Sequence, residues 1–395
     1  MTVKVHSKIP ITKPFFGAEE AAAVTRPLET GWVVQGPFVQ QFEDTFAAFT
    51  GADHAVATSS CTTALHLVVE ALGTSPGDEV LVPAFTWVAT PNVVEYVGAR
   101  PVFCDVDLDT FNVNTEALKA AITPRTVGII PVHLFGLCAD IDAVQRIARQ
   151  HHLWIAEDAA CAFGARWRGY HAGTFGAAGC FSFHPRKAIT TGEGGMITTN
   201  RRELVELVRT LRDHGASRSD RARHDRSGSF LLPEYPLRGY NYRMTDIQAA
   251  LGCAQMQRAA WIQAERARVA RAYDELLADV AWLRLPKAPA DFVHGYQSYV
   301  CLFAPERPTL SNVQRMHAAR NRLMATLEEQ GIATRQGTHA PVFTEYYVQK
   351  YDFRPEQFPQ AYLAERLSLS LPLYPQMTTE DIERVAIELR EAFDR

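Results

Sequence analysis

The sequence lacks the features of a disulfide-rich, membrane-spanning or nucleic-acid-binding protein. Its seven cysteines are scattered, odd in number and without a CxxC pair, so we expect no disulfide framework or zinc knuckle and favour a reducing compartment. No run of about 18 apolar residues occurs, which argues against a membrane span. The 40 basic and 44 acidic residues give a net charge of -4, without the basic excess of a nucleic-acid-binding surface. The N-terminal residues have no continuous apolar core, so no secretory signal is predicted and a cytoplasmic protein is expected.

The 395 residues are enough for two or three domains of about 150 residues each. Over the first two thirds, short β-rich runs alternate with helical stretches. Several runs are continuously apolar, as expected for strands covered on both faces. The alternation predicts an α/β fold with a mostly parallel, seven-stranded sheet flanked by helices. The expected strands are His54–Thr58, Glu79–Pro83, Pro101–Asp105, Val127–Val132, Leu153–Asp158, Gly179–Phe183 and Met196–Thr199.

The pattern changes in the last third of the chain. The polar segment Ser217–Pro236 is typical of an exposed loop, and Met244–Leu277 predicts one long helix or two in series. A strand at Tyr299–Phe303 and two helices then suggest a smaller C-terminal α+β domain. We expect a large domain with an N-terminal arm over residues 1–257 and a small domain over residues 258–395.

The segment from Phe181 to Gly195 contains a single lysine, Lys187, between a predicted strand and a glycine-rich stretch. A lysine at the end of a sheet can lose its hydration, which lowers the pKa of its amine and makes it a nucleophile toward carbonyl groups. The glycines would let the backbone approach a ligand closely. For this segment alone, a surface lysine in an ordinary turn is the competing interpretation.

Three further segments end at the same edge of the predicted sheet, where ligands bind in such folds. The carboxylate of Asp158 could pair with a cationic ring nitrogen or cap a helix. Hydroxyl and backbone N–H groups of Thr58–Thr63 suit a phosphate, but they could also form an ordinary N-cap. Trp87 could stack on a flat ligand or belong to the core. Together with Lys187, these groups describe a pyridoxal phosphate pocket.

An ordered set of motifs covers nearly the whole chain. The motifs are Gly31-Trp-Val-Val-Gln-Gly-Pro, Ser60-Cys-Thr-Thr-Ala-Leu, Thr86-Trp-Val-Ala-Thr, Pro131-Val-His-Leu-Phe-Gly, Glu157-Asp-Ala-Ala, the lysine segment, Gly239-Tyr-Asn-Tyr-Arg-Met-Thr-Asp and Leu371-Pro-Leu-Tyr-Pro. This set resembles the sugar aminotransferases of the DegT/StrS family, in particular those that aminate C4 of a nucleotide-linked sugar. The resemblance implies fold type I of the pyridoxal phosphate enzymes (the aspartate aminotransferase fold), pyridoxal 5'-phosphate as cofactor, and no metal.

The resemblance also implies a role for each matching position. Lys187 would hold the cofactor covalently and then move a proton during transamination. Asp158 would keep the pyridine nitrogen protonated, and Trp87 would stack on the ring. The phosphate would be bound by the backbone of Cys61, by Thr62 and Ser182, and by Asn241 of the neighbouring subunit in a homodimer.

Two positions depart from the family pattern. Cys161 stands where the family usually has Gln or His near the 3-oxygen of the ring. Because a thiol is a poor hydrogen-bond donor, we expect this contact to be lost or taken over by water. Cys61 replaces a common glycine, and backbone binding of the phosphate should survive because it uses no side chain.

Four residues are candidate substrate contacts from their positions, namely Trp32, His184, Arg243 and His339. Each has a structural alternative. Trp32 could be a core aromatic, the two histidines could be polar loop residues, and Arg243 could be an ion-pair partner at a dimer interface. His133 lies in a strand-end motif and is expected to be structural.

Lysine at position 187 favours transamination, because family members with His there act as 3-dehydratases. The Gly192-Glu-Gly-Gly form resembles enzymes that aminate C4, whereas the C3-aminating branch more often has Gly-Asp-Gly. We expect a homodimeric enzyme that transfers an amino group from L-glutamate to the C4 keto group of a nucleotide-linked 4-keto-6-deoxyhexose, for an O-antigen or antibiotic sugar. The alternatives are amination at C3, a cyclitol or free-sugar ketone, sugar dehydration, or a non-catalytic binding protein. Neither a nucleic acid nor a membrane is an expected partner.

Overall fold

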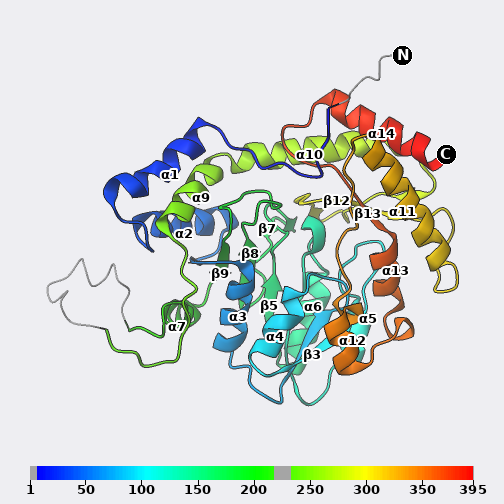
Figure 1. The fold of residues 1–395 in the computed structure, drawn as a ribbon. Helices are drawn as coiled ribbons and strands as arrows, with labels where there is room; N and C mark the ends of the chain where they lie inside the picture. Colours follow the sequence, from blue (N-terminus) through cyan, green and yellow to red (C-terminus); the bar gives the residue numbers. More distant parts are fainter. Residues whose placement is uncertain (1–6, 218–232, 395) are drawn as a thin grey trace.

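A computed structural model of the chain describes residues 7–217 and 233–394, and Figure 1 shows its fold. The loop predicted at Ser217–Pro236 lies mostly outside the described residues, so that prediction stays open. Within the described part, no helix combines the length and the apolar character that a bilayer span needs.

The centre of the fold is a seven-stranded sheet with the order β1-β9-β8-β5-β4-β2-β3. Its strands are β1 (His54–Thr58), β2 (Glu79–Pro83), β3 (Arg100–Cys104), β4 (Thr126–Ile129), β5 (Trp154–Asp158), β8 (Ala178–Ser182) and β9 (Gly195–Thr199). The strands from β8 to β3 are parallel, whereas β9 is antiparallel to both β1 and β8. The predicted α/β fold with a mostly parallel, seven-stranded sheet is confirmed.

One expected strand is shorter than predicted. The apolar run Val127–Val132 predicts a single strand, but β4 ends at Ile129. Beyond this point the N–H of Ile130 still donates to Leu81 of β2, and the backbone pairs with β5 through an isolated bridge between Val132 and Asp158. The early end of β4 brings the following segment beside the carboxyl end of β5.

Helices cover the sheet and continue into the C-terminal third. They are α1 (Ala18–Thr30), α2 (Pro37–Thr50), α3 (Cys61–Ala71), α4 (Ala89–Tyr96), α5 (Thr115–Ala120), α6 (Ile141–His151), α7 (Arg202–Arg212), α9 (Asp246–Gln257), α10 (Ala259–Leu276), α11 (Val313–Glu329), α12 (Glu345–Tyr351), α13 (Pro359–Leu367) and α14 (Thr379–Asp394). The expected helix or helix pair over Met244–Leu277 is a pair, α9 and α10, separated at Arg258. Figure 1 shows α10 passing over the top of the molecule toward α14.

Alternate residues of the strands face opposite helix layers. On β2, Val80 and Val82 pack in one apolar cluster with Leu65 of α3, whereas Leu81 packs in a second cluster with Val144 of α6. This alternation follows from the geometry of a strand, in which successive side chains point to opposite faces. Burial on both faces explains the continuously apolar runs in the sequence, and it leaves the strand ends as the place for polar chemistry.

The C-terminal part contains a separate three-stranded antiparallel sheet, β10 (Leu283–Arg284), β12 (Tyr299–Phe303) and β13 (Ser368–Leu371). The helices α11, α13 and α14 pack around it, which agrees with the expected α+β character. A further small sheet joins β6 (Arg166–Trp167), β7 (Tyr170–His171) and β11 (Phe292–Val293). The division into residues 1–257 and 258–395 stays a prediction.

Candidate active site

The lysine singled out by the sequence lies in the turn that follows β8. Its Nζ donates a hydrogen bond to the Sγ atom of Cys161 at 3.1 Å, so the structure brings these two predicted site residues into contact. Burial acts to lower the pKa of Lys187, but the attraction and hydrogen bond of Cys161, with a smaller contribution from Asp158, outweigh it and raise the pKa. The expectation of a lowered lysine pKa is therefore wrong for the cofactor-free pocket, because the contact with Cys161 outweighs the effect of lost hydration.

Asp158 ends β5 and is almost completely buried. Its Oδ2 accepts a hydrogen bond from Thr90 Oγ1 at 2.7 Å, and its Oδ1 accepts one from the N–H of Ala160 at 3.1 Å. Burial raises the pKa of Asp158, while these donors and the nearby Lys187 act in the opposite direction. A carboxylate held in this way is preorganised to pair with a cationic ring nitrogen, since its donors fix its orientation and burial strengthens any charge pairing.

The start of α3 provides free backbone donors beside these groups. Ser60 caps the helix, and its Oγ accepts a hydrogen bond from the N–H of Thr63 at 3.1 Å. The N–H groups of Cys61 and Thr62 have no acceptor among the described residues. Burial raises the pKa of the Cys61 thiol well above its usual value, which keeps this side chain neutral. Two free N–H groups at a helix start favour an anion such as a phosphate.

Gly195 lets the strands approach this helix start. A Cβ atom at position 195 would lie 2.4 Å from the backbone carbon and oxygen of Ser60 and 2.6 Å from the backbone nitrogen of Cys61. Gly195 pairs with Thr58 on one side and with Ser182 on the other, so it joins the ends of β1, β9 and β8. Any larger residue would have to displace the backbone at the start of α3.

The remaining predicted cofactor contacts differ in how far they are buried. Ser182 is half-buried at the end of β8 and accepts a hydrogen bond from the N–H of His184 at 3.4 Å. Asn241 is exposed, and its backbone forms an isolated bridge with Asp213. Its side chain is therefore available to a neighbouring molecule. Trp87 is 56% exposed, which excludes the core-aromatic alternative for this residue.

The predicted substrate contacts divide into two groups. His339 is exposed and lies beside Trp87, with a ring-centroid distance of 5.7 Å. Trp32 is half-buried, and its Nε1 donates to the carbonyl oxygen of Gln35 at 3.2 Å. The other two have roles within the chain. Burial lowers the pKa of His184, and its Nδ1 accepts a hydrogen bond from the N–H of Arg186 at 3.2 Å.

Arg243 forms an ion pair with Asp213 at 2.6 Å. This ion pair lies within the chain, and a role of Arg243 at a dimer interface stays a prediction. Both groups are only partly exposed, so the pair holds the segment that carries Asn241 against the end of α7.

Sequence reasoning missed Thr90 and Thr86. The hydroxyl groups of these two residues lie 3.0 Å apart, and Thr90 in turn donates to Asp158. Both are buried. Thr86 lies in the bend before α4 and Thr90 in its first turn, and the motif Thr86-Trp-Val-Ala-Thr contains both residues but does not identify the partner carboxylate.

These residues fit pyridoxal 5'-phosphate. The free N–H groups of Cys61 and Thr62, together with the space that Gly195 leaves, suit the phosphate, while Asp158 and Lys187 offer a carboxylate and an amine at neighbouring strand ends. In the described part of the chain, no three His, Cys, Asp or Glu side chains gather in a way that could hold a metal ion.

Comparisons with known proteins identify the relatives of this chain. The chain matches the DegT/DnrJ/EryC1/StrS aminotransferase family over residues 14–390. It is 37% identical over 391 residues to the spore coat polysaccharide biosynthesis protein SpsC of Bacillus subtilis, covering 99% of this chain and 98% of that protein. The structure superimposes with a TM-score of 0.89 on Helicobacter pylori PseC, an aminotransferase of pseudaminic acid biosynthesis, at 26% identity and with 98% and 100% of the two chains covered.

A third relative bears on the cofactor. Spr1654 of Streptococcus pneumoniae, described as a sugar aminotransferase, is 26% identical, and the alignments cover 98% of this chain and 99% of that one. The TM-score is 0.90 for its PMP form and 0.88 for its PLP form. The chain therefore belongs to the DegT/DnrJ/EryC1/StrS aminotransferase family and is a pyridoxal-phosphate-dependent sugar aminotransferase.

Proposed function

We propose that this enzyme transfers an amino group from L-glutamate to the C4 keto group of a nucleotide-linked 4-keto-6-deoxyhexose. The observation that carries the proposal is the juxtaposition of Lys187, Asp158 and the free N–H groups at the start of α3 on adjacent strand ends. The cofactor, when bound, supplies an electron sink that makes the exchange of an amine for a ketone possible. The chain's own groups bind it, orient it and move the proton.

Each residue has a defined task in this proposal. Lys187 would hold the cofactor covalently and would afterwards carry the proton from the donor carbon. Asp158, which Thr90 and Ala160 orient, keeps the ring nitrogen protonated. Trp87 covers one face of the ring. The phosphate is bound by the backbone of Cys61 and the side chains of Thr62 and Ser182, together with Asn241 of a second subunit.

Two sequence features support the choice of reaction and position. Lysine rather than histidine at 187 favours transamination over dehydration. The Gly192-Glu-Gly-Gly form favours amination at C4 over C3. The exposure of Asn241 supports a homodimer with shared sites, in which a separated monomer would be inactive. Trp32 and His339 remain the proposed sugar contacts. Arg243 and His184 also remain proposed substrate contacts, and their hydrogen bonds within the chain would hold them in place.

The test is a screen of keto-sugar nucleotides against enzyme whose cofactor has first been converted to its amine form with L-glutamate. GDP-, UDP- and dTDP-linked 4-keto-6-deoxyhexoses would be added separately, with a cyclitol ketone and a free keto sugar as comparisons. Recovery of the cofactor absorbance reports turnover, mass spectrometry reports amine incorporation, and NMR assigns the aminated carbon.

The proposal predicts that one nucleotide-linked substrate gives an amine at C4 and that Lys187→Ala gives none. Amination at C3, or turnover of only the free sugar or cyclitol, would overturn the substrate assignment while leaving the enzyme class intact. Loss of a sugar oxygen without amine incorporation would instead establish dehydration.

A further inference from the structure

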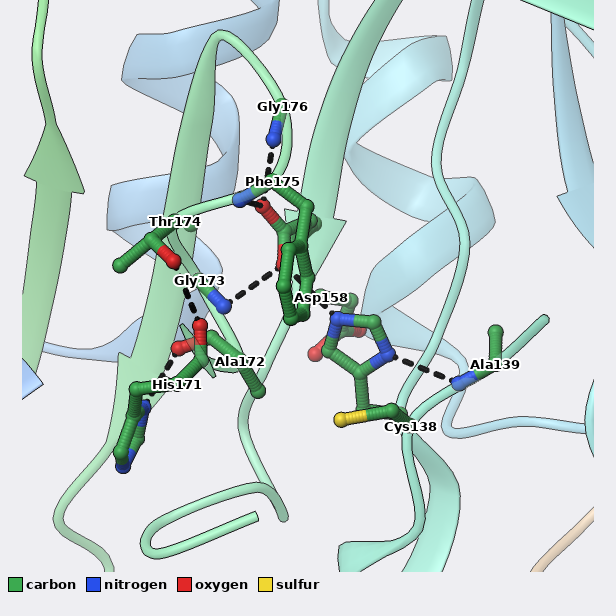
Figure 2. Close-up of polar contacts among 12 residues, drawn as sticks. Cys138, Ala139, Asp158, His171, Ala172, Gly173, Thr174, Phe175 and Gly176 are labelled. Carbon is green, nitrogen blue, oxygen red and sulfur yellow. Dashed lines mark hydrogen bonds and ion pairs between the residues drawn. The ribbon is translucent and has the colours of Figure 1, made fainter. Parts of the chain in front are cut away.

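A buried carboxylate lies next to Asp158 and faces the opposite side of β5. Glu157 is completely buried, as expected for a residue whose side chain alternates with that of its neighbour along the strand. It accepts three backbone hydrogen bonds, at 2.6 Å from Gly173 and at 2.7 Å from both Phe175 and Gly176. Figure 2 shows the N–H groups of these three residues pointing toward the same carboxylate. The turn formed by residues 173–176 is thus folded around a single carboxylate.

His133 supplies the fourth hydrogen bond to this carboxylate. Its Nε2 lies 2.9 Å from Glu157, and its Nδ1 accepts a hydrogen bond from the N–H of Ala139 at 3.1 Å. Because Nδ1 is an acceptor, the ring proton is on Nε2, and the ring donates it to Glu157. The ring of His133 is completely buried, so both of its nitrogens are satisfied inside the protein.

The same histidine is tied to Asp158 through the main chain. The N–H of His133 donates to the carbonyl oxygen of Asp158 at 3.0 Å, and the N–H of Asp158 donates to the carbonyl oxygen of Pro131 at 2.9 Å. The segment after β4 is therefore held twice at the end of β5, by the backbone at Asp158 and by the side chain at Glu157. Neither the ring of His133 nor the carboxylate of Glu157 makes a hydrogen bond to a predicted cofactor-contacting side chain.

This arrangement connects the segments that carry the site. The turn 173–176 leads directly into β8, which ends at Ser182 and is followed by Lys187. A buried carboxylate is costly unless donors satisfy it, and a partly satisfied buried network is worse than none. Four donors from two segments can satisfy Glu157 only in one arrangement of β5, the turn and the segment after β4. The network thereby fixes the position of Asp158 relative to the lysine-bearing strand.

We propose that Glu157 and His133 are positioning residues of the cofactor site, acting through Asp158 and β8 rather than by touching the cofactor. The proposal rests on the proposed role of Asp158 as the partner of the ring nitrogen. A Glu157→Gln change retains shape but replaces one oxygen by an NH2 group. That group would face N–H donors on either side and break part of the network.

The experiment compares purified Glu157→Gln with a control from the same turn, Thr174→Ala. Thr174 donates its hydroxyl hydrogen to the carbonyl oxygen of His171 at 2.7 Å, so the control also loses a turn hydrogen bond while leaving Glu157 intact (Figure 2). Circular dichroism checks folding of each cofactor-free protein. Titration with pyridoxal 5'-phosphate, followed by absorbance, gives the dissociation constant and the pH dependence of the spectrum. Steady-state assays separate kcat from KM.

Glu157→Gln loses one or two hydrogen bonds to a charged group, so we expect it to weaken cofactor binding about tenfold or more. We also expect it to shift the pH dependence of the spectrum and to lower kcat, with KM for the sugar unchanged. Thr174→Ala should leave cofactor binding, the pH dependence of the spectrum and kcat unchanged, even if its melting temperature changes. If Glu157→Gln does not fold, His133→Asn tests the same network from its other side. A folded Glu157→Gln or His133→Asn with the wild-type dissociation constant, spectrum and kcat would reduce the network to a structural role and overturn the proposal.

A parallel variant, Asp158→Asn, separates this outcome from failure of the proposed function. If Asp158→Asn loses cofactor affinity and turnover but Glu157→Gln keeps both, the positioning proposal is refuted and the proposed role of Asp158 stands. Unchanged behaviour of Asp158→Asn would refute the role of Asp158 and, with it, the basis of the positioning proposal.

Discussion

The hydrogen bond from Thr90 to Asp158 gives the sharpest prediction about the cofactor site. Thr90 is completely buried, and its hydroxyl donates at 2.7 Å to one oxygen of the carboxylate. This bond lowers the pKa of Asp158, opposing the larger effect of burial, which raises it. Replacing Thr90 by Val keeps the branched shape but removes the donor, so the ionised carboxylate loses a hydrogen bond at a buried position.

A hydrogen bond to a charged group contributes about 1.5–3 kcal/mol, and each 1.4 kcal/mol is a factor of about ten. We therefore expect Thr90→Val to weaken cofactor binding, or to slow turnover, by about 10- to 100-fold. The dissociation constant of pyridoxal 5'-phosphate and kcat are the quantities to measure. Thr90→Ser is the matched control, because it keeps the hydroxyl group, and should remain within a few-fold of wild type.

Two results together would refute the reasoning. The Thr90→Val enzyme would have the wild-type cofactor affinity and kcat, while the separate Asp158→Asn variant would be inactive. That pattern would mean that Asp158 works without its threonine donor. Equal losses in Thr90→Val and Thr90→Ser would point to packing at the start of α4 rather than to the hydrogen bond.

Three further predictions follow from the pKa directions in the structure. Burial raises the pKa of Asp158, so above the ordinary aspartate pKa the folded cofactor-free protein binds more protons than its unfolded chain. The cofactor-free protein therefore loses stability as the pH rises from the ordinary aspartate pKa to the raised one. Asp158→Asn should raise the melting temperature of the cofactor-free protein at pH 7 and lower that of the cofactor-saturated protein. Cys161→Ala removes the thiol that opposes the effect of burial, so it should lower the pKa of Lys187. The pH profile of covalent cofactor attachment should then move to lower pH. An unchanged profile would mean that the thiol has no influence on the amine. Burial lowers the pKa of His171 to about 4, so the free energy of unfolding should fall as the pH drops below about 6.5, by about 2 kcal/mol at pH 5. Denaturant unfolding at pH 7 and pH 5 should show a smaller fall in the free energy of unfolding for His171→Asn than for wild type.

Much of the fold could be predicted because its signals are local. Apolar runs of four to six residues, bounded by turns, identified all seven strands of the central sheet, and strands β1 and β2 have the predicted bounds. The error at β4 has a physical cause. An apolar run continues to Val132, but the chain leaves the sheet after Ile129 so that the backbone of His133 can pair with Asp158. Pattern alone does not register such a departure, since the residues beyond the strand are equally buried.

The candidate site was predictable to the extent that its residues lie at strand ends. Lys187, Asp158 and the start of α3 follow strands, and the strand order brings these ends together. What Lys187 contacts there was not predictable, and neither was the direction of its pKa. Both depend on Cys161, which lies 26 residues away in the chain and 3.1 Å away in space.

By itself, the sequence determined the class of fold, the edge of the sheet that holds the chemistry and, through its resemblance to a family, the enzyme class. Those properties are written in local patterns of burial and in short motifs. Only the tertiary structure decided that Arg243 pairs with Asp213, that Thr90 supports Asp158 and that Glu157 gathers a turn and His133 behind it. These contacts join residues far apart in the chain, and their energies depend on distance and burial, which exist only once the strands have paired in their final order.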